Sequence, residues 1–392
     1  MPTGAVVTGA SYRALAVVRS LGRRGVPVRV IRSDEHALAA SSRYAGPRLA
    51  WPAGGDEARV AYLLDLAERE ALDRWVLIPT HDEEAALFAR HHDVLAQRYR
   101  LTTPPWETLR AAYDKRCTHD LAASAGVAQP WTIFPAGVAD LARARDRFPV
   151  VVKPAYKAEA NRLTVDKAWR ADDAATLRSR YEEACTLVDA AILMVQELVP
   201  GDGAGQLSCA ALCADGAVLA SLVARRTRQY PMDFGRASSF VETIDDPGVE
   251  RDARRLLGAS GLSGLVEVEF KRDPRTGENL LLDVNPRAWG WQSLCGRAGV
   301  DFPWLLWRMA RGEDVPPARP APGVRWIRMT TDVLAAAGEL RAGRLSPAAY
   351  LRSLRRPLEF AVFARDDPLP ALVGPLVTAR LVAGRIAEGR PV

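Results

Sequence analysis

The chain has 392 residues, enough for two or three domains around a large hydrophobic core. Hydrophobic residues make up 48% of the sequence and charged residues 26%, which is typical of a soluble globular protein, and no apolar run reaches the roughly 18 residues that cross a bilayer. The net charge of +6 comes mainly from arginines spread along the chain without interleaved aromatic residues, which argues against nucleic acid and for a small polyanionic partner. The five cysteines are scattered, so we expect buried thiols and a cytoplasmic location.

Residues 1–114 alternate short apolar runs with helical patterns, which predicts an N-terminal parallel α/β domain of Rossmann-like type. We expect strands at 5–8 and 28–31, with a helix over 12–24 between them. The turn Thr8-Gly9-Ala10-Ser11 is similar to the cofactor site of short-chain dehydrogenases, which keeps an NAD(P)-dependent oxidoreductase as a distant alternative. The further glycines of that family are missing, however, and no tyrosine in the chain has a lysine four residues later.

A third strand is predicted at 75–79, and the polar run Thr80-His81-Asp82-Glu83-Glu84 follows it. Open α/β sheets bind ligands at the C-terminal ends of their strands, so these side chains are candidates for a binding site. Acidic residues also suit the positive N-terminal end of a helix. Both interpretations stay open at the level of the sequence.

Lysine is scarce, which draws attention to the places where it occurs: 115, 153, 157, 167 and 271. A helix is predicted over 114–125, with Lys115 in its first turn. An apolar strand over 148–154 ends in Lys153-Pro154 and places a compact cation at the end of a sheet. Further along, the pattern predicts a strand over 192–199, a hairpin over 207–224 and a helix over 247–261.

The stretch 262–287 contains two alternating runs joined by a Pro/Gly turn, which predicts a β-hairpin. The expected register pairs Asp273 with Asn279, Lys271 with Leu281, Glu269 with Asp283 and Glu267 with Asn285. The opposite, apolar face should lie on the core and consists of Val266, Val268, Phe270, Leu280, Leu282 and Val284. Like charges directly opposite each other destabilise a sheet, so Glu269 and Asp283 indicate a bound cation. Carboxylates beside an amide suit Mg²⁺, and the fork of donors on Arg287 suits an anion bridged to that metal, which points to phosphate chemistry.

The run Glu-Val-Glu-Phe at 267–270, followed by Asp-Val-Asn-Pro-Arg at 283–287, resembles the metal-binding end of the ATP-grasp superfamily. That superfamily includes biotin carboxylase, carbamoyl phosphate synthetase and D-alanine–D-alanine ligase. Upstream stretches resemble its other landmarks in the right order. The resemblance implies an N-terminal α/β pre-ATP-grasp domain at 1–114, a two-lobed α+β ATP-grasp core at 115–312 (lobes 115–200 and 201–312), and a mainly helical C-terminal extension at 313–392.

The resemblance also assigns roles to individual residues. Lys115 and Lys153 would hold the phosphates of ATP. The adenine would lie on the linker Gln196-Glu197-Leu198-Val199, and Asp202 would bind the ribose. Glu269, Asp283 and Asn285 would hold Mg²⁺, with Mn²⁺ possible, while Arg287 and Arg225 would neutralise the transferred phosphoryl group. Two features depart from the superfamily: the loop 155–161 contains no glycine, and Asp283 stands where most relatives have Glu.

The function that this resemblance implies is an ATP-dependent carboxylate–amine ligase that releases ADP and phosphate. Its partners would be ATP, a small carboxylate and an amine, with a homodimer possible. Two alternatives stay open: a carboxylase or phosphotransferase on the same core, and a non-catalytic ATP-binding module.

Overall fold

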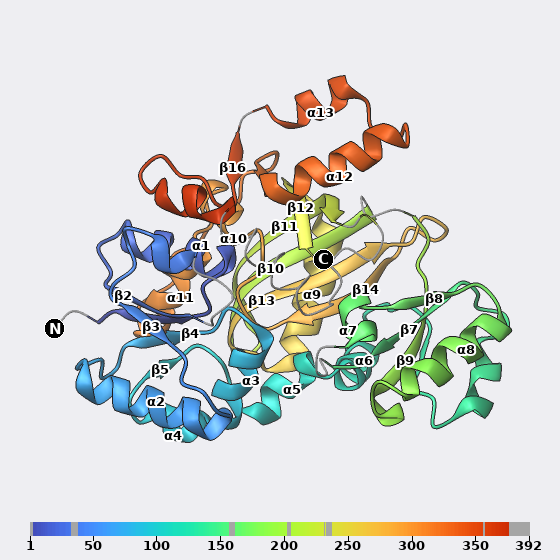
Figure 1. Cartoon of the computed structure of the whole chain (residues 1–392), viewed down its shortest axis with the longest axis horizontal. Helices are drawn as coiled ribbons and strands as arrows, with labels where there is room; N and C mark the ends of the chain where they lie inside the picture. Colours follow the sequence, from blue (N-terminus) through green and yellow to red (C-terminus); the bar gives the residue numbers. More distant parts are fainter. Residues whose placement is uncertain are drawn as a thin grey trace.

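The computed structural model describes residues 3–32, 38–156, 161–201, 205–230, 232, 237–355 and 357–375. Their strands form three sheets: a five-stranded sheet near the N-terminus, a four-stranded sheet in the middle of the chain, and a seven-stranded sheet that follows it. Figure 1 shows the four-stranded sheet in a separate green lobe, with the large sheet between it and the blue N-terminal domain. Among the described residues, none of the helices combines the length and the hydropathy needed to cross a bilayer.

The N-terminal sheet is parallel throughout, in the order β3-β2-β1-β4-β5. Its strands are β1 (Ala5–Thr8), β2 (Val28–Arg32), β3 (Arg48–Ala50), β4 (Val76–Ile78) and β5 (Arg100–Leu101). Its helices are α1 (Tyr12–Gly22), α2 (Asp56–Arg69), α3 (Asp82–Arg90) and α4 (His92–Ala96), with a 3-10 turn at Ala39–Ser41. The parallel α/β architecture predicted from the sequence is confirmed, and the predicted strands and the first helix end within a residue or two of their predicted bounds.

Two helices, α5 (Trp106–Tyr113) and α6 (Lys115–Ser124), lead from this domain into the four-stranded lobe. Asp114 caps α6 by accepting a hydrogen bond from the backbone of Arg116 at 3.0 Å, which fixes Lys115 as the first helical residue. The lobe has the strand order β6-β9-β7-β8. Its elements are β6 (Thr132–Ile133), β7 (Val150–Pro154), α7 (Arg162–Asp166), β8 (Trp169–Ala171), α8 (Ala174–Cys185) and β9 (Leu193–Glu197), with 3-10 turns at Val138–Ala144 and Ala190–Ile192.

The large sheet has the order β14-β13-β10-β11-β12-β15-β16. Its strands are β10 (Gln206–Ala214), β11 (Ala217–Tyr230), β12 (Ala237–Ile244), β13 (Gly264–Arg272), β14 (Asn279–Asn285), β15 (Arg325–Ile327) and β16 (Leu358–Phe360). Three helices belong to it: α9 (Pro247–Ser260), α10 (Gln292–Arg297) and α11 (Phe302–Ala310). One face packs with α5, α6 and α9 in a single apolar cluster, and the other packs with α1, α10 and α11. The large sheet therefore joins the N-terminal domain to the rest of the chain.

The hairpin β13–β14 forms as predicted at its functional end and differs at its turn. Glu267 lies opposite Asn285 and Glu269 opposite Asp283, as expected. A bulge after Glu269 shifts the remaining pairs by one residue, so that Phe270 pairs with Leu281, Lys271 with Leu280, and Arg272 with Asn279. The predicted pairs Asp273 with Asn279 and Lys271 with Leu281 are therefore wrong. The bulge also reverses two side chains: Leu281 enters the core, whereas Leu282 lines a cavity.

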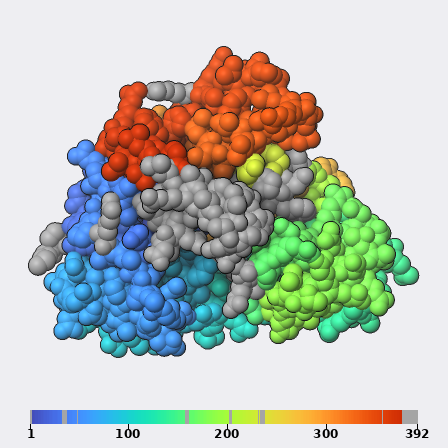
Figure 2. Space-filling view, in the orientation of Figure 1, coloured from blue at the N-terminus to red at the C-terminus, as the bar shows by residue number. Residues whose placement is uncertain are grey.

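The described part of the segment after residue 312 contains the helices α12 (Met329–Arg341) and α13 (Pro347–Ser353). It also contributes β15 and β16, which the sequence did not predict, to the edge of the large sheet. In Figure 1, α12 crosses above β11 and β12, and in Figure 2 the red part of this segment lies against the blue N-terminal domain. Arg19 of α1 donates to Asp367 at 2.9 Å in a buried ion pair, which ties the two ends of the described chain together.

Candidate active site

A cavity of about 1060 Å³ lies where the N-terminal domain, the small lobe and the large sheet meet. Its lining includes Tyr12 and Asp82 from the first of these, Lys153 and Gln196 from the second, and Glu269 from the third. The volume is at the upper end of the range for small-molecule sites and is large enough for a nucleotide with a second molecule beside it.

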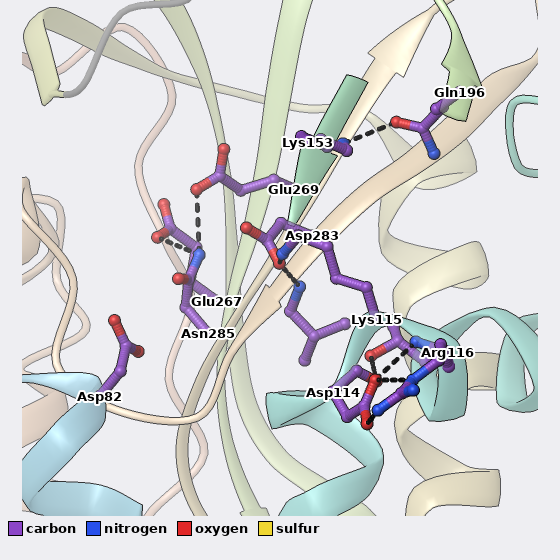
Figure 3. Close-up of polar contacts among 12 residues, drawn as sticks. Asp82, Asp114, Lys115, Arg116, Lys153, Gln196, Glu267, Glu269, Asp283 and Asn285 are labelled. Carbon is purple, nitrogen blue, oxygen red and sulfur yellow. Dashed lines mark hydrogen bonds and ion pairs between the residues drawn. The ribbon is translucent and has the colours of Figure 1, made fainter. Parts of the chain in front are cut away.

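The wall formed by β13 and β14 carries the acidic side chains of the predicted metal site. Asn285 donates through Nδ2 to Glu269 Oε1 at 2.9 Å and to Glu267 Oε2 at 3.3 Å, and Figure 3 shows these three side chains pointing toward one another. Asp283 lies beside Glu269 on the same face, where Lys115 Nζ donates to its Oδ1 at 2.5 Å. The structure thus brings together all three residues that the sequence predicted as metal ligands.

The donor set of this wall fits Mg²⁺ that arrives with a phosphate ligand. Within the described residues, no three acidic, His or Cys side chains converge into a ready metal cage. Mg²⁺ is usually held by one or two carboxylates together with substrate phosphates, and Glu269, Asp283 and the Asn285 amide provide such oxygen ligands. Lys115 now occupies part of the space around Asp283, so its ammonium must move or share that carboxylate when a metal binds.

Burial and neighbouring charges set the ionisation of the two glutamates of β13. Burial raises the pKa of Glu267 to about 7, helped by the negative charge of Glu269. The same burial acts on Glu269, but the cations of Arg226 and Lys167 outweigh it and lower its pKa. Glu269 is therefore kept charged, as a cation ligand must be. Glu267 accepts hydrogen bonds from Trp291 Nε1 at 2.7 Å and from Asn285 Nδ2 at 3.3 Å.

Every lysine among the described residues lines this cavity, namely Lys115, Lys153, Lys167 and Lys271. Lys153 Nζ donates to Gln196 Oε1 at 2.7 Å, as Figure 3 shows. Burial, and then the charge of Lys115, lower the pKa of Lys153 to about 8. Burial likewise lowers the pKa of Lys167 to about 8. No role was predicted for Lys167, although the scarcity of lysine was the signal that could have identified it. Lys157 lies outside the described residues.

The expected adenine linker also lies on the cavity: Gln196, Glu197, Leu198 and Val199 all line it. Two cations from the hairpin hold this linker. Lys271 Nζ donates to the carbonyl oxygens of Val199 at 2.9 Å and Gly201 at 2.7 Å, and Arg275 donates to Glu197 at 2.7 Å. Asp202, predicted to bind the ribose, lies outside the described residues.

The arginine of β11 that reaches the cavity is Arg226, whereas the sequence favoured Arg225. Arg226 lines the cavity and donates through Nη2 to Glu269 Oε2 at 3.1 Å. Arg225 is exposed on the other face of the strand, where its guanidinium approaches Glu242 at 3.5 Å. Because side chains alternate along a strand, an error of one residue exchanges the two faces. The placement of Arg225 at the site is therefore corrected to Arg226.

Arg287 lines the cavity, but its donors are engaged by the protein. It forms a two-bond pair with Asp82, at 2.7 and 3.2 Å, and donates to Asn285 Oδ1 at 2.9 Å. Asp82 begins α3, so this pair links the N-terminal domain to the metal wall. The two interpretations of the acidic run 80–84 both apply: Glu84 accepts from the backbone amides of Thr80 and His81 at 3.2 Å each, while Asp82 and Glu83 line the cavity.

Known proteins resemble this chain in sequence and in fold. Residues 190–331 match a family described as ATP-grasp in the biosynthetic pathway with Ter operon. D-alanine–D-alanine ligase B of Xanthomonas campestris pv. campestris is 29% identical over 177 residues, which cover 41% of this chain and 51% of that enzyme. The match therefore spans about half the length of that relative.

Two solved structures resemble the fold of about four fifths of this chain. The L-amino acid ligase of Bacillus licheniformis has a TM-score of 0.61 at 14% identity, covering 79% of this chain and 75% of that one. The biotin carboxylase domain of the Hydrogenobacter thermophilus 2-oxoglutarate carboxylase, in complex with MgADP and bicarbonate, has a TM-score of 0.66 at 15% identity and covers 83% and 74%. At these identities the likeness establishes the fold.

Proposed function

Because this chain has the ATP-grasp fold, we propose that it is an ATP-dependent ligase that joins a carboxylate to an amine. The observation that carries the proposal is the wall of Glu269, Asp283 and Asn285, which lines the same cavity as four lysines, one of which, Lys115, contacts Asp283. An arrangement of hard oxygen ligands opposite ammonium groups suits the transfer of a phosphoryl group.

In the proposed reaction, a carboxylate oxygen of the substrate attacks the γ-phosphorus of ATP, and the bond from that phosphorus to ADP breaks. The amine then attacks the carbon of the acyl phosphate, loses a proton, and displaces inorganic phosphate. Such chemistry requires mainly positioning and charge neutralisation from the protein.

The residues of the chain take separate roles in this scheme. Lys115 and Lys153 hold phosphates, and the linker from Gln196 to Val199 holds the base. Glu269, Asp283 and Asn285 bind Mg²⁺, which supplies positive charge to the phosphates. Arg226 adds a cation beside Glu269.

Arg287 acts first by holding Asn285 in place, and its direct contact with the transferred phosphoryl group requires that it leave Asp82. Asp202 remains the proposed ribose ligand. The amine and the carboxylate are small molecules that bind in the same cavity.

The test is ADP release by the purified protein with Mg²⁺-ATP, screened against pools of carboxylic acids with and without amines. We expect release that requires both partners, and Glu269→Ala should lower it by on the order of 100-fold or more, because the metal wall loses a ligand. Glu278→Ala is the matched control, since Glu278 is exposed in the turn of the same hairpin.

Three results would contradict the proposal. Unchanged release in Glu269→Ala would remove the metal wall from the reaction. Release that depends on bicarbonate alone would indicate a carboxylase, and tight ATP binding without release in any pool would indicate a non-catalytic ATP-binding module. Circular dichroism of each variant checks that the fold is intact.

A further inference from the structure

The end of the cavity beside the N-terminal domain contains an arginine, Arg13, whose guanidinium has no hydrogen-bond or ion-pair partner among the described residues. Arg13 lies in the first turn of α1, directly after the turn at 9–11 that leaves β1, and its half-buried side chain lines the cavity. Across the described ranges, no hydrogen bond or ion pair of its guanidinium is recorded, and its Nε is fully buried without an acceptor. A buried cation of this kind is costly unless something pairs with it.

Three other cations of the cavity differ from Arg13 in this respect. Lys115 is paired with Asp283, Arg226 with Glu269, and Arg287 with Asp82. Burial, and then the positive charge of Arg287, lower the pKa of Arg13, although an arginine keeps its proton at physiological pH. Among the described residues, no acidic side chain therefore contacts Arg13, because the nearby acids pair with other groups.

The surroundings of Arg13 strengthen the positive potential. The adjacent Tyr12 is buried, and although burial raises its pKa, the cations of Arg328, Arg13 and Arg287 outweigh it, so that the net pKa is lowered. The guanidinium of Arg328 lies over the Tyr12 ring, 4.5 Å from its centroid. Gly290 lies close to the phenol, since a Cβ added there would lie 3.1 Å from the Tyr12 hydroxyl.

The place of Arg13 separates it from the nucleotide end of the cavity. The charges that act most strongly on it are those of Arg287, Tyr12, Asp82 and Glu267. Figure 3 shows Asp82 on the far side of the acidic wall from Lys153 and Gln196. A substrate whose reacting carboxylate lies beside the metal wall would therefore extend toward Arg13 on the side away from ATP.

We propose that Arg13 binds a second, non-reacting anionic group carried by one of the two substrates. This inference rests on the proposed ligase function. A carboxylate or a phosphate would pair with the guanidinium of Arg13 where it lines the cavity. Either substrate, the acid or the amine, can carry this anion. In both cases the anion is a charged group remote from the bond that forms.

The experiment uses pairs of probes that differ in one charge. Monocarboxylic acids are compared with dicarboxylic acids of the same chain length, such as butyrate with succinate and hexanoate with adipate. Amino acids are compared with their amides, such as alanine with alaninamide. ADP release is measured for the wild type, Arg13→Ala, Arg13→Lys and the control Arg69→Ala, which removes an exposed arginine of α2 outside the cavity.

We expect the wild type to prefer the charged member of one set of pairs, and the set that shows the preference identifies which substrate carries the anion. Arg13→Ala should raise the KM for that member by roughly 10- to 100-fold with a smaller change in kcat, and should abolish the preference. Arg13→Lys should restore part of the preference for the charged member, whereas Arg69→Ala should retain the full preference. The Kd for MgADP should be the same in all four proteins.

Other outcomes would overturn the inference. The proposed anion site is refuted if the preference survives in Arg13→Ala. It is also refuted if the wild type uses charged and uncharged probes equally. A large loss of MgADP affinity in Arg13→Ala would place the residue on the nucleotide instead.

If no probe stimulates ADP release, the proposed ligase function fails, and the anion site is then judged by calorimetry with MgADP and the charged probes. Binding heat that disappears in Arg13→Ala supports the site without the ligase. The absence of heat in the wild type overturns it.

Discussion

At the scale of single residues, the alternation of side chains on β11 decides which arginine serves the site. Arg226 contacts Glu269, whereas its neighbour Arg225 faces solvent beside Glu242. We expect Arg226→Ala to lower kcat by on the order of 100-fold, because a cation close to the metal wall is lost. Arg225→Ala provides the matched control and should stay within about twofold of the wild type. Comparable losses in both variants would contradict the assignment, and thermal unfolding of both proteins separates activity from stability.

The lowered pKa of Lys153, about 8, predicts a pH dependence of nucleotide binding. In the free protein the ammonium is lost as the pH rises through that value, whereas bound phosphates stabilise the charged form. The affinity for MgADP should therefore fall above pH 8, by up to about tenfold per pH unit. Lys153→Arg stays charged and should show little of this dependence. A wild-type affinity that is constant from pH 7 to 9 in calorimetry would show that Lys153 does not contact the phosphates.

The lowered pKa of Lys153 also determines how the stability of the ligand-free protein changes with pH. The ordinary pKa of lysine is 10.5, so between about 8 and 10.5 the unfolded chain binds the proton of Lys153 that the folded chain has released. The contribution of Lys153 to the free energy of unfolding therefore rises with pH across that window and is constant below it.

At the scale of elements, the hairpin β13–β14 performs two tasks. One face presents the metal wall, and Lys271 on the same strand holds the carbonyl oxygens of the linker at Val199 and Gly201. Lys271→Met should raise the Kd for MgADP by roughly 3- to 10-fold, because the linker loses two charge-assisted hydrogen bonds near the surface. The kcat at saturating ATP should change little.

The next residue, Arg272, supplies the matched control. Its side chain is on the opposite face of β13, where it contacts Asp246 and Asn279. Arg272→Met should leave the Kd for MgADP within about twofold of the wild type. An equal loss in both variants, measured by calorimetry, would mean that the effect comes from the hairpin's stability and not from the linker.

Local sequence patterns predicted the secondary-structure elements well. The strand β1, the helix α9 and the pairing of Glu269 with Asp283 follow from periodicity and turn residues. The bulge after Glu269 was missed because two adjacent leucines, Leu281 and Leu282, suit either face of a strand. The contributions of Arg13 and Lys167 to the site were not predicted, because both residues approach it from other elements. A single sequence does not encode their distances from the site in any local pattern.

At the scale of the whole molecule, two adjacent acids near the end of the described chain fasten the N-terminal domain. Asp367 pairs with Arg19 and also accepts from Ser42 Oγ at 2.7 Å and from the backbone of Arg43 at 2.9 Å, with side-chain exposures of 1% for the acid and 6% for Arg19. Asp366 pairs with Arg23 on the surface, where both side chains are about two-fifths exposed.

Removing the buried acid should cost far more than removing the exposed one. Asp367→Ala leaves Arg19 buried without its partner and should lower the free energy of unfolding by about 3–5 kcal/mol. Asp366→Ala, the neighbouring control, should cost at most about 1 kcal/mol. Urea unfolding of the three proteins measures both values. Equal losses would indicate that the pair Arg19–Asp367 does not hold the two ends together.

The ion pair between Arg19 and Asp367 also has a consequence for the order of events during synthesis. The two residues are 348 positions apart, so α1 leaves the ribosome long before its acidic partner is translated. Until then the buried arginine of the first domain has no counter-charge from that partner. The domain made first therefore reaches its full stability only after the segment that contains Asp367 has been translated.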